Sequence, residues 1–249
     1  MAFLETQHLT HIFPNGTIGI RDINLSFKEG DFAILAGTNG SGKTVLVRHF
    51  NGLLTPTMGK VLFAGRSVAA DLIHTRKNVG LIFQDSNNQI VGQTVAEDVS
   101  FGPENLGLPA AEIRQRVQDA LDAVELSHLA AERPHLLSGG QKRKLAIAGV
   151  LAMKPKIIIF DEPFTGLDYP GVLHVLRQLL SLHRQGHTII MITHELEKVL
   201  AHAQRLIIME NGKVVMDGEP EQIIGGVERY GIKLPYGENR KVETMTWLR

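Results

Sequence analysis

The first thirty residues alternate between apolar and polar side chains, which is typical of β-strands with one buried face. Two such runs, 3–13 and 20–30, flank the turn signal Pro14-Asn15-Gly16. We therefore expect the chain to begin with a pair of antiparallel strands.

Further along, continuously apolar segments alternate with segments whose apolar residues recur every three or four positions. The first kind is typical of strands buried on both faces, and the second of amphipathic helices. Strands are expected at 31–37, 59–65, 78–85, 156–163 and 188–195, with a hairpin at 205–218 around Asn211-Gly212. Helices are expected at 43–54 (apolar Val45, Leu46, Phe50 and Leu53), at 110–126 (Ile113, Val117, Leu121 and Val124 on one face) and at 171–186, ended by Gly186. This order predicts an α/β fold in which helices cover both faces of a parallel sheet.

Two regions depart from this alternation. Residues from about 86 to 153 have a mostly helical pattern, which predicts a helical subdomain inserted into the sheet domain. Residues 219–249 contain several glycines and prolines. We therefore expect one domain over residues 1–220 and a short, loosely structured appendage at 221–249.

The composition says more about possible partners than about the fold. The chain has 249 residues, 43% hydrophobic and 21% charged, which is ordinary for a globular protein. A formal net charge of +0 gives no reason to expect nucleic acid, and the absence of cysteine excludes disulfides and thiolate metal sites. No apolar run approaches the roughly 20 residues that cross a bilayer, and the N-terminus lacks the features of a signal peptide. We expect a cytoplasmic protein.

A phosphate-loop motif follows the strand expected at 31–37. The residues GTNGSGKT, 37–44, match G-x-x-x-x-G-K-[ST] between a strand and a helix. Glycines let such a loop curl so that its N–H groups point at phosphate oxygens, while the lysine reaches the β- and γ-phosphates and the threonine binds Mg²⁺. The residues expected to bind ATP here are Gly37, Asn39, Gly40, Ser41, Gly42, Lys43 and Thr44. The motif predicts a P-loop NTPase core of the RecA-like type.

Acidic residues end the apolar strand at 156–163, at the sheet edge where α/β proteins bind ligands. We expect Asp161 to hold Mg²⁺ and Glu162 to polarise the attacking water. His194 leaves another apolar strand in the same manner and is a candidate contact for the γ-phosphate. No Asn-Lys-x-Asp guanine-binding motif is present, which disfavours a GTPase.

A second glycine-containing helix start lies at LSGGQ, residues 137–141. A helix N-terminus offers free N–H groups and a positive dipole end to an anion. A single nucleotide does not need two such starts, and a small-molecule kinase would not need the second one.

Taken together, these motifs resemble those of the ABC ATPases, the nucleotide-binding subunits of ABC transporters, over about residues 3–220. The family order is present: the phosphate loop, Gln84, LSGGQ, IIIFDEP at 157–163, GLD at 166–168 and His194. The resemblance implies that two such domains pair head to tail, so that LSGGQ of one closes over ATP held by the other. It assigns Ser138, Gly139, Gly140, Gln141 and Asp168 to the site in trans, Phe13 to adenine stacking, and Gln84 to sensing Mg²⁺ and water. Tyr169 stands where a proline commonly follows the aspartate.

Two stretches, 83–109 and 137–152, resemble the energy-coupling-factor ATPases, which serve vitamin and cobalt or nickel uptake. That resemblance implies a second ATPase subunit, a transmembrane coupling protein joined to a substrate-binding membrane protein, and a place at the cytoplasmic face of the membrane. Asp85, Glu97 and Asp98 are candidates to receive arginines of the coupling protein, although solvated loop acids explain them equally well.

Several alternatives stay open at this point. The cargo is open among cobalt, nickel, biotin and other vitamins, and the ATPase pair is either a homodimer or a heterodimer. A soluble regulatory ATPase that acts on ribosomes, DNA or protein assembly, and a non-catalytic ATP sensor, are the competing functions. The chain has eleven histidines, but we do not expect a metal site on it, since His8 and His11 fall on opposite strand faces and Gly186 separates His183 from His187. We interpret these four as surface residues.

Overall fold

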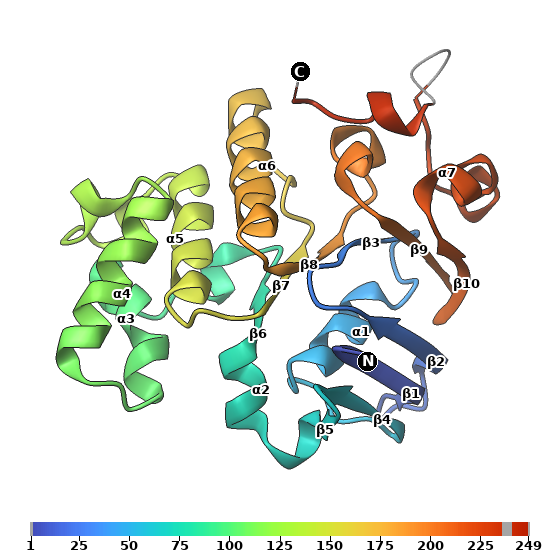
Figure 1. The fold of residues 1–249 in the computed structure, drawn as a ribbon, viewed down its shortest axis with the longest axis horizontal. Helices are drawn as coiled ribbons and strands as arrows, with labels where there is room; N and C mark the ends of the chain where they lie inside the picture. The colour runs from blue at the N-terminus through green and yellow to red at the C-terminus, as the bar shows by residue number, and fades with distance from the viewer. Residues whose placement is uncertain (1, 236–240, 249) are drawn as a thin grey trace.

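The computed structural model describes residues 2–235 and 241–248 of the chain. Within them, two sheets and a group of helices are arranged side by side (Figure 1). A four-stranded antiparallel sheet, in the order β2-β1-β4-β5, comprises β1 (Leu4–Ile12), β2 (Ile18–Phe27), β4 (Met58–Phe63) and β5 (Arg66–Ser67).

The central sheet has six strands in the order β10-β9-β3-β8-β7-β6. It comprises β3 (Phe32–Ala36), β6 (Val79–Ile82), β7 (Ile157–Asp161), β8 (Thr188–Ile192), β9 (Arg205–Glu210) and β10 (Lys213–Gly218). The strands β9, β3, β8, β7 and β6 are parallel, and β10 runs antiparallel to β9. The predicted parallel sheet is therefore confirmed, as is the hairpin at Asn211-Gly212, where φ is 49° and 74°.

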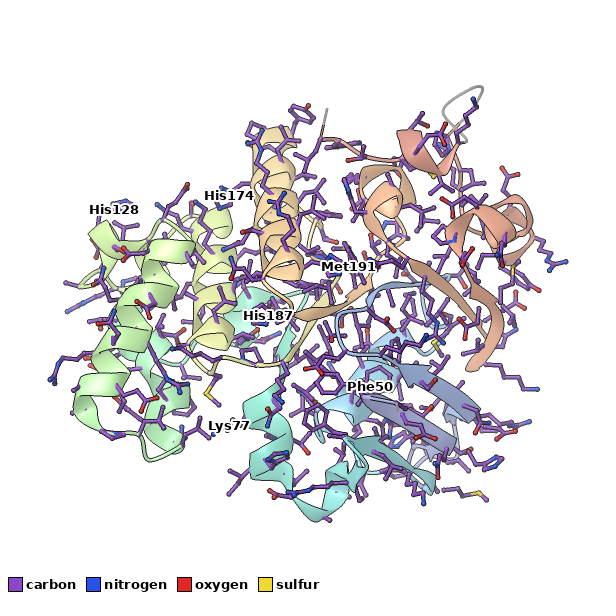
Figure 2. All side chains as sticks on the ribbon, viewed as in Figure 1. Phe50, Lys77, His128, His174, His187 and Met191 are labelled. Atoms are coloured by element: carbon purple, nitrogen blue, oxygen red, sulfur yellow. The ribbon has the colours of Figure 1, made fainter. Side chains whose placement is uncertain are left out.

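Alternate residues of the central strands enter two different cores, as the period of two requires. Ala33 and Leu35 of β3 belong to the core shared with the antiparallel sheet and the first helix. Phe32 and Ile34 belong to the core shared with the later helices. In the first core, Phe50 packs edge-on against Phe27 with ring centroids 5.7 Å apart (Figure 2). Both faces of the sheet are thus covered, which explains its continuously apolar strands.

The helices fill the intervals between strands. They are α1 (Lys43–Phe50), α2 (Leu72–Asn78), α3 (Val95–Asn105), α4 (Ala110–Ala123), α5 (Gly139–Leu151), α6 (Tyr169–Arg184) and α7 (Pro220–Ile223). Short 3₁₀ helices lie at Val68–Ala70, Ser86–Asn88, Ser127–Leu129, Pro134–Leu136, Leu196–Lys198, Leu200–His202, Ile224–Tyr230 and Val242–Thr244. Helices α3, α4 and α5 form the helical insertion between β6 and β7, on the left of Figure 1. Among the described residues, no helix is both long and apolar enough to cross a membrane.

The first helix is shorter than predicted, whereas the apolar face predicted at 110–126 is present but unevenly buried. The first helix ends at Phe50, with Asn51 as its C-cap, so Leu53 lies beyond it and is 43% exposed. In α4, Leu121 is buried, but Ile113 and Val117 are only partly covered. The apolar face of α4 is therefore buried only towards its C-terminal end.

The C-terminal region is better packed than its composition suggested. Val227, Ile232, Leu234, Val242 and Met245 are all at most 6% exposed and belong to the core of the later helices. The backbone N–H of Ala201 also donates to the carbonyl oxygen of Met245 at 3.0 Å. The expectation of a loosely structured appendage is wrong for the described part of 221–249.

Candidate active site

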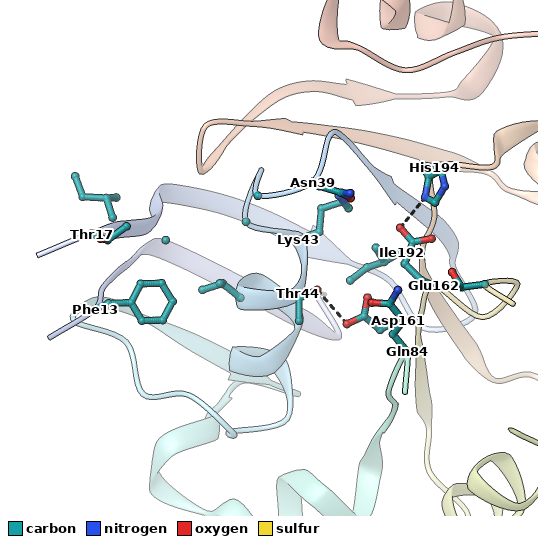
Figure 3. Close-up of a pocket in the computed structure, with 16 residues that line it drawn as sticks. Phe13, Thr17, Asn39, Lys43, Thr44, Gln84, Asp161, Glu162, Ile192 and His194 are labelled. Atoms are coloured by element: carbon teal, nitrogen blue, oxygen red, sulfur yellow. Dashed lines mark hydrogen bonds and ion pairs between the residues drawn. The ribbon is translucent and has the colours of Figure 1, made fainter. Parts of the chain in front are cut away.

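A cavity of about 420 Å³ opens at the carboxyl edge of the central sheet (Figure 3). It is lined by Phe13, Thr17, Ile18, Gly19, Asn39, Gly40, Gly42, Lys43, Thr44, Val45, Gln84, Asp161, Glu162, Thr165, Ile192 and His194. The sheet edge therefore brings together most of the residues expected in a single site. Thr17, Ile18, Gly19 and Thr165 carry no motif and were not expected from the sequence.

The phosphate loop is shaped by glycines that no other residue can replace without strain. Gly37 has φ of 149°, and a Cβ there would lie 2.2 Å from the carbonyl oxygen of Met209. Gly42, the N-cap of α1, has φ of 100°, and its Cβ would lie 2.7 Å from the carbonyl oxygen of Gly19. The loop thus curls in a left-handed backbone region that glycine alone adopts readily.

Lys43 lies inside this loop. Its Nζ donates to the carbonyl oxygens of Gly37, at 2.7 Å, and of Thr38, at 2.9 Å, and lies 3.5 Å from Ser41 Oγ. Gly37 and Ser41 do not line the cavity themselves, so they support Lys43 from behind. Burial lowers the pKa of the Lys43 ammonium, while the charges of Glu162 and Asp161 act in the opposite direction.

Asp161, at the end of β7, joins the loop to the sheet. Its Oδ2 accepts a hydrogen bond from Thr44 Oγ1 at 3.0 Å, and Gln84 lines the same end of the cavity (Figure 3). Burial raises the pKa of Asp161, against the lowering effect of the Thr44 hydrogen bond. A hydroxyl, a carboxylate and an amide oxygen are the hard ligands that Mg²⁺ prefers, so these three side chains fit a magnesium ion.

Glu162 occupies a strained position next to Asp161. Its φ is 50°, a left-handed conformation that a glutamate adopts at a cost. One carboxylate oxygen, Oε1, pairs with Nδ1 of His194 at 3.0 Å. The other, Oε2, is buried and has no hydrogen-bond partner among the described residues. An unpaired buried oxygen beside a cavity is suited to accept a proton from a bound water.

Phe13 lies at the opposite end of the cavity from this carboxylate (Figure 3). Its ring packs over Gly19, where a Cβ would come within 2.8 Å of the phenylalanine ring. His11 contacts the ring edge-on, with centroids 4.7 Å apart. The ring is half-buried, so it offers one face to a flat ligand.

Ser138, Gly139, Gly140 and Gln141 do not line this cavity. Ser138 and Gln141 form a capping box at the start of α5: Gln141 N–H donates to Ser138 Oγ at 3.3 Å, and Ser138 N–H donates to Gln141 Oε1 at 2.8 Å. Apart from chain neighbours and the backbone of α5 itself, no atom of the described residues lies within 4 Å of a Cβ added to either glycine. They are also helical, so neither their backbone nor their surroundings in this chain require glycine.

Asp168 is likewise outside the cavity and caps α6, where its Oδ1 accepts from Gly171 N–H at 3.0 Å. The LSGGQ residues and Asp168 therefore have structural partners within the chain but no contact with its own cavity.

Arg143 is a site residue that the motifs did not reveal. It is 7% exposed, and its guanidinium donates to the carbonyl oxygens of Gln84, at 2.9 Å, and Glu162, at 3.3 Å. It therefore connects the helix that begins with LSGGQ to the backbone of two cavity residues. The available signal was its place on the same helical face as Ile147 and Val150, both of which are buried.

The three acids considered for a membrane partner have different surroundings. Asp98 is 8% exposed, and its Oδ1 accepts from the N–H groups of Val91, at 2.7 Å, and Gly92, at 2.9 Å. Asp85 and Glu97 are exposed. Asp85 Oδ1 accepts from the N–H group of Asn87 at 3.0 Å, and Glu97 Oε2 accepts from that of Gln93 at 3.2 Å. Asp98 thus fixes a loop, whereas the other two remain accessible.

A groove of about 560 Å³ lies close to these acids. It is lined by Asn87, Ile90, Gly92, Gln93, Arg133, Pro134, His135 and Lys142. Its charged lining side chains are basic, and Lys142 Nζ donates to Asn87 Oδ1 at 3.0 Å.

The histidines are dispersed, as the labels of His128, His174 and His187 in Figure 2 illustrate. Among the described residues, no group of three or more histidine, aspartate and glutamate side chains is arranged to hold a metal ion. His183 and His187 are half-buried and bond the carbonyl oxygens of Gly30, at 2.9 Å, and Pro155, at 2.8 Å. The interpretation of these two as surface residues is therefore wrong.

Comparisons with known proteins agree with this geometry. The ABC transporter family model matches residues 20–165. The chain belongs to the ABC transporter family. Its relatives identify a subgroup of that family. The chain is 43% identical to the energy-coupling factor transporter ATP-binding protein EcfA of Methanocaldococcus jannaschii, over 94% of this chain and 86% of the relative. It is also 46% identical to EcfA1 of Caldanaerobacter subterraneus subsp. tengcongensis, over 94% of this chain and 88% of the relative. This ABC ATPase therefore belongs among the energy-coupling factor ATP-binding proteins.

Solved structures show the same fold. The ABC ATPase matches cbiO1 of Clostridium perfringens, described as part of the ABC transporter complex cbiONQ, with a TM-score of 0.81, 37% identity and 92% of each chain covered. It also matches a dimeric ATP-binding cassette in a post-hydrolysis state bound to ADP and Pi, with a TM-score of 0.79 and 28% identity, over 87% of this chain and 98% of that one.

Proposed function

We propose that this chain is the ATP-hydrolysing subunit that drives an energy-coupling-factor type importer. The observation that carries the proposal is the Glu162 carboxylate beside the phosphate loop. His194 fixes one of its oxygens, and the other has no hydrogen-bond partner in the described part of the chain. Such a group can orient a water molecule for attack on the γ-phosphorus and accept its proton as the bond to ADP breaks.

The other cavity residues have complementary roles in this proposal. Lys43 leaves its loop carbonyls to neutralise charge on the β- and γ-phosphates, and Phe13 stacks on adenine. Thr44, Asp161 and Gln84 hold Mg²⁺, which supplies positive charge to the phosphates when it is bound. Arg143 keeps the backbones of Gln84 and Glu162 in register with α5.

The LSGGQ segment acts on a second ATPase subunit. Glycine in a helix costs about 1 kcal/mol relative to alanine, yet nothing in this chain needs it at positions 139 and 140. Glycines in such places are explained if a ligand approaches the backbone closely from outside. We infer that Ser138, Gly139, Gly140 and Gln141, with Asp168 nearby in the interface, close over ATP bound by the partner's phosphate loop.

The relatives support a proposal for the cargo and the membrane partners. The similar proteins are described as energy-coupling factor subunits, and one as part of cbiONQ. We therefore propose a transmembrane coupling protein and a substrate-binding membrane protein as partners, cobalt, nickel or a vitamin as the cargo, and a place at the cytoplasmic face of the membrane. The groove lined by Asn87 and Lys142 is the proposed docking surface for the coupling protein, with the exposed Asp85 and Glu97 close to it.

The substitution Glu162→Gln tests the core of this proposal. We expect it to lower kcat for ATP by a factor on the order of 10²–10⁴ while ATP still binds, because the amide cannot accept the proton. Light scattering of the variant should give a doubled mass with Mg-ATP and a monomer with EDTA if the partner is a second copy. The exposed Glu29→Gln serves as the matched control and should keep wild-type turnover.

Three results would redirect the proposal. Near wild-type turnover of Glu162→Gln would remove the role given to that residue. A monomer under both conditions would favour a different ATPase as the partner. Purification with ribosomes instead of membranes would favour a soluble regulatory ATPase.

A further inference from the structure

Three segments that leave the active site meet the C-terminal segment at a single buried lysine. Lys198, four residues beyond His194, is 6% exposed. Its ammonium forms an ion pair with Glu195 and lies 4.5 Å from the centre of the Trp247 ring and 5.6 Å from that of Phe164. Phe164 follows Glu162 by two residues, so the lysine contacts the segments after both β7 and β8.

Trp247, in the C-terminal segment, also contacts the third of these segments, the start of α6. Its ring lies 5.3 Å from that of Tyr169, the residue directly after Asp168 and the first of α6. Figure 1 shows the C-terminal segment running across the top of the view towards the upper end of α6. Trp247 thus lies between the ammonium of Lys198 on one side and the residue next to Asp168 on the other.

The C-terminal segment is anchored independently of these rings. Trp247 N–H donates to the carbonyl oxygen of Lys198 at 3.2 Å, and His202 Nε2 lies 2.7 Å from Thr246 Oγ1. Met245 is fully buried below them. The indole is therefore held in place by the backbone on either side of it, and its contact with Lys198 does not depend on a flexible tail.

A buried ammonium needs its charge compensated, and here the compensation comes from one carboxylate and two ring faces. Each of these three partners belongs to a different segment. The lysine therefore resists any motion that separates the segments, because such a motion would leave its charge with fewer partners.

We propose that Lys198 and Trp247 form a brace that positions His194, Glu162 and Asp168 relative to one another. This inference rests on the proposed ATPase function, since it concerns how the residues of that site move together when the subunit closes over ATP. Lys198 and Trp247 are positioning residues, and neither lines the cavity. Tyr169, which is 57% exposed, places the ring stack at the surface beside Asp168.

Trp247 is the only tryptophan of the chain, so its fluorescence reports on the brace directly. We expect the emission of Glu162→Gln to change in intensity or wavelength on addition of Mg-ATP, with a midpoint equal to the ATP dissociation constant measured by calorimetry. Emission that stays constant at saturating Mg-ATP would overturn the proposal.

Steady-state ATP hydrolysis provides the second measurement. Lys198→Met keeps the apolar stem and removes the charge, and Trp247→Ala removes the ring. We expect each variant to lower kcat about fivefold, because it removes one cation–π contact. The KM for ATP should stay within about twofold of the wild-type value. The double variant should be no worse than either single variant, because both remove one interaction. Trp247→Phe should restore most of the activity, and the exposed Glu243→Gln is the matched control.

The outcomes separate this proposal from the proposed function. If the wild-type protein hydrolyses ATP and Glu162→Gln does not, the proposed function stands, and an unchanged kcat in Lys198→Met and Trp247→Ala would overturn the brace alone. Additive losses in the double variant would also overturn it. If Trp247→Ala does not fold, Lys198→Met and the emission of Glu162→Gln still decide.

Discussion

At the scale of single residues, Asp161 and Glu162 are neighbours in the chain but have opposite surroundings. Asp161 accepts a hydrogen bond from Thr44 and is buried at the end of β7, which raises its pKa. Glu162 turns away with φ of 50°, is held by His194, and keeps one oxygen unpaired among the described residues. The positive φ of Glu162 turns the two adjacent carboxylates towards different partners, as their proposed roles of metal ligand and base require.

The raised pKa of Asp161 has a consequence for stability. Because the folded protein binds this proton more tightly than the unfolded chain, the contribution of Asp161 to stability is full below its unfolded pKa, near 3.8, and is lost as the pH rises through the folded value. At neutral pH the charged carboxylate therefore opposes folding.

We predict that Asp161→Asn raises the melting temperature at pH 7.5 in EDTA by about 1–3 °C, because the amide avoids burying a charge. We expect Mg-ATP to stabilise the wild-type protein and the same variant to lose this stabilisation, because it lacks the anionic ligand. Thermal unfolding in both buffers measures the two effects. A lower melting temperature in EDTA, or undiminished stabilisation by Mg-ATP, would contradict the prediction.

At the scale of elements, helix α5 shows how one segment serves two purposes. Its N-terminus carries a capping box and two glycines that have open space around them, while its next turn buries Arg143 against the cavity backbone. The capping box already provides hydrogen-bond partners at the helix start. The glycines therefore weaken the helix, and no contact among the described residues compensates for this.

We therefore predict opposite effects of Gly140→Ala on stability and activity. The free energy of unfolding should rise by up to about 1 kcal/mol, because alanine favours the helix, while kcat for ATP falls at least about tenfold, because the methyl group obstructs the partner's nucleotide. Urea unfolding and steady-state hydrolysis measure these quantities.

Gly149→Ala offers a control in the same helix, since its added Cβ would meet only Asp98 Oδ2 at 4.0 Å. It should gain stability and keep its activity. Equal activity of both variants would mean that the start of α5 does not approach a nucleotide.

At the scale of the whole molecule, the C-terminal segment is part of the core. Val242 and Met245 pack with residues from the helices and the central sheet, and the backbone of Ala201 is bonded to that of Met245. The glycines and prolines of 219–249 suggested a loose segment. The described part of this segment instead packs against the residues that follow β8.

We predict that Met245→Ala lowers the free energy of unfolding by about 2–4 kcal/mol, the usual cost of a cavity at a buried methionine. Denaturation in urea measures the change, with the exposed Glu243→Ala as the control. A loss below about 0.5 kcal/mol would show that the segment does not contribute to the core.

The sequence determined the features that depend on neighbours in the chain. The phosphate loop, the hairpin at Asn211-Gly212 and the buried strands follow from glycine conformation and from apolar periodicity, which act over a few residues. The motifs also predicted that Lys43, Asp161 and His194 lie in one site, because the carboxyl ends of parallel strands share one edge. Phe13, beside the antiparallel sheet, was predicted only from the family resemblance.

Tertiary structure alone decided the contacts between distant segments. The burial of Met245, the link from Arg143 to Gln84 and Glu162, and the approach of Trp247 to Lys198 join residues that are about 20 to 60 positions apart or lie in separate elements. Leu53, which the pattern placed in the first helix, lies beyond the end of that helix and is 43% exposed. Periodicity states which face of an element is apolar, but only the packing of the elements determines which neighbour covers it, since many neighbours of similar shape and polarity would satisfy the same pattern.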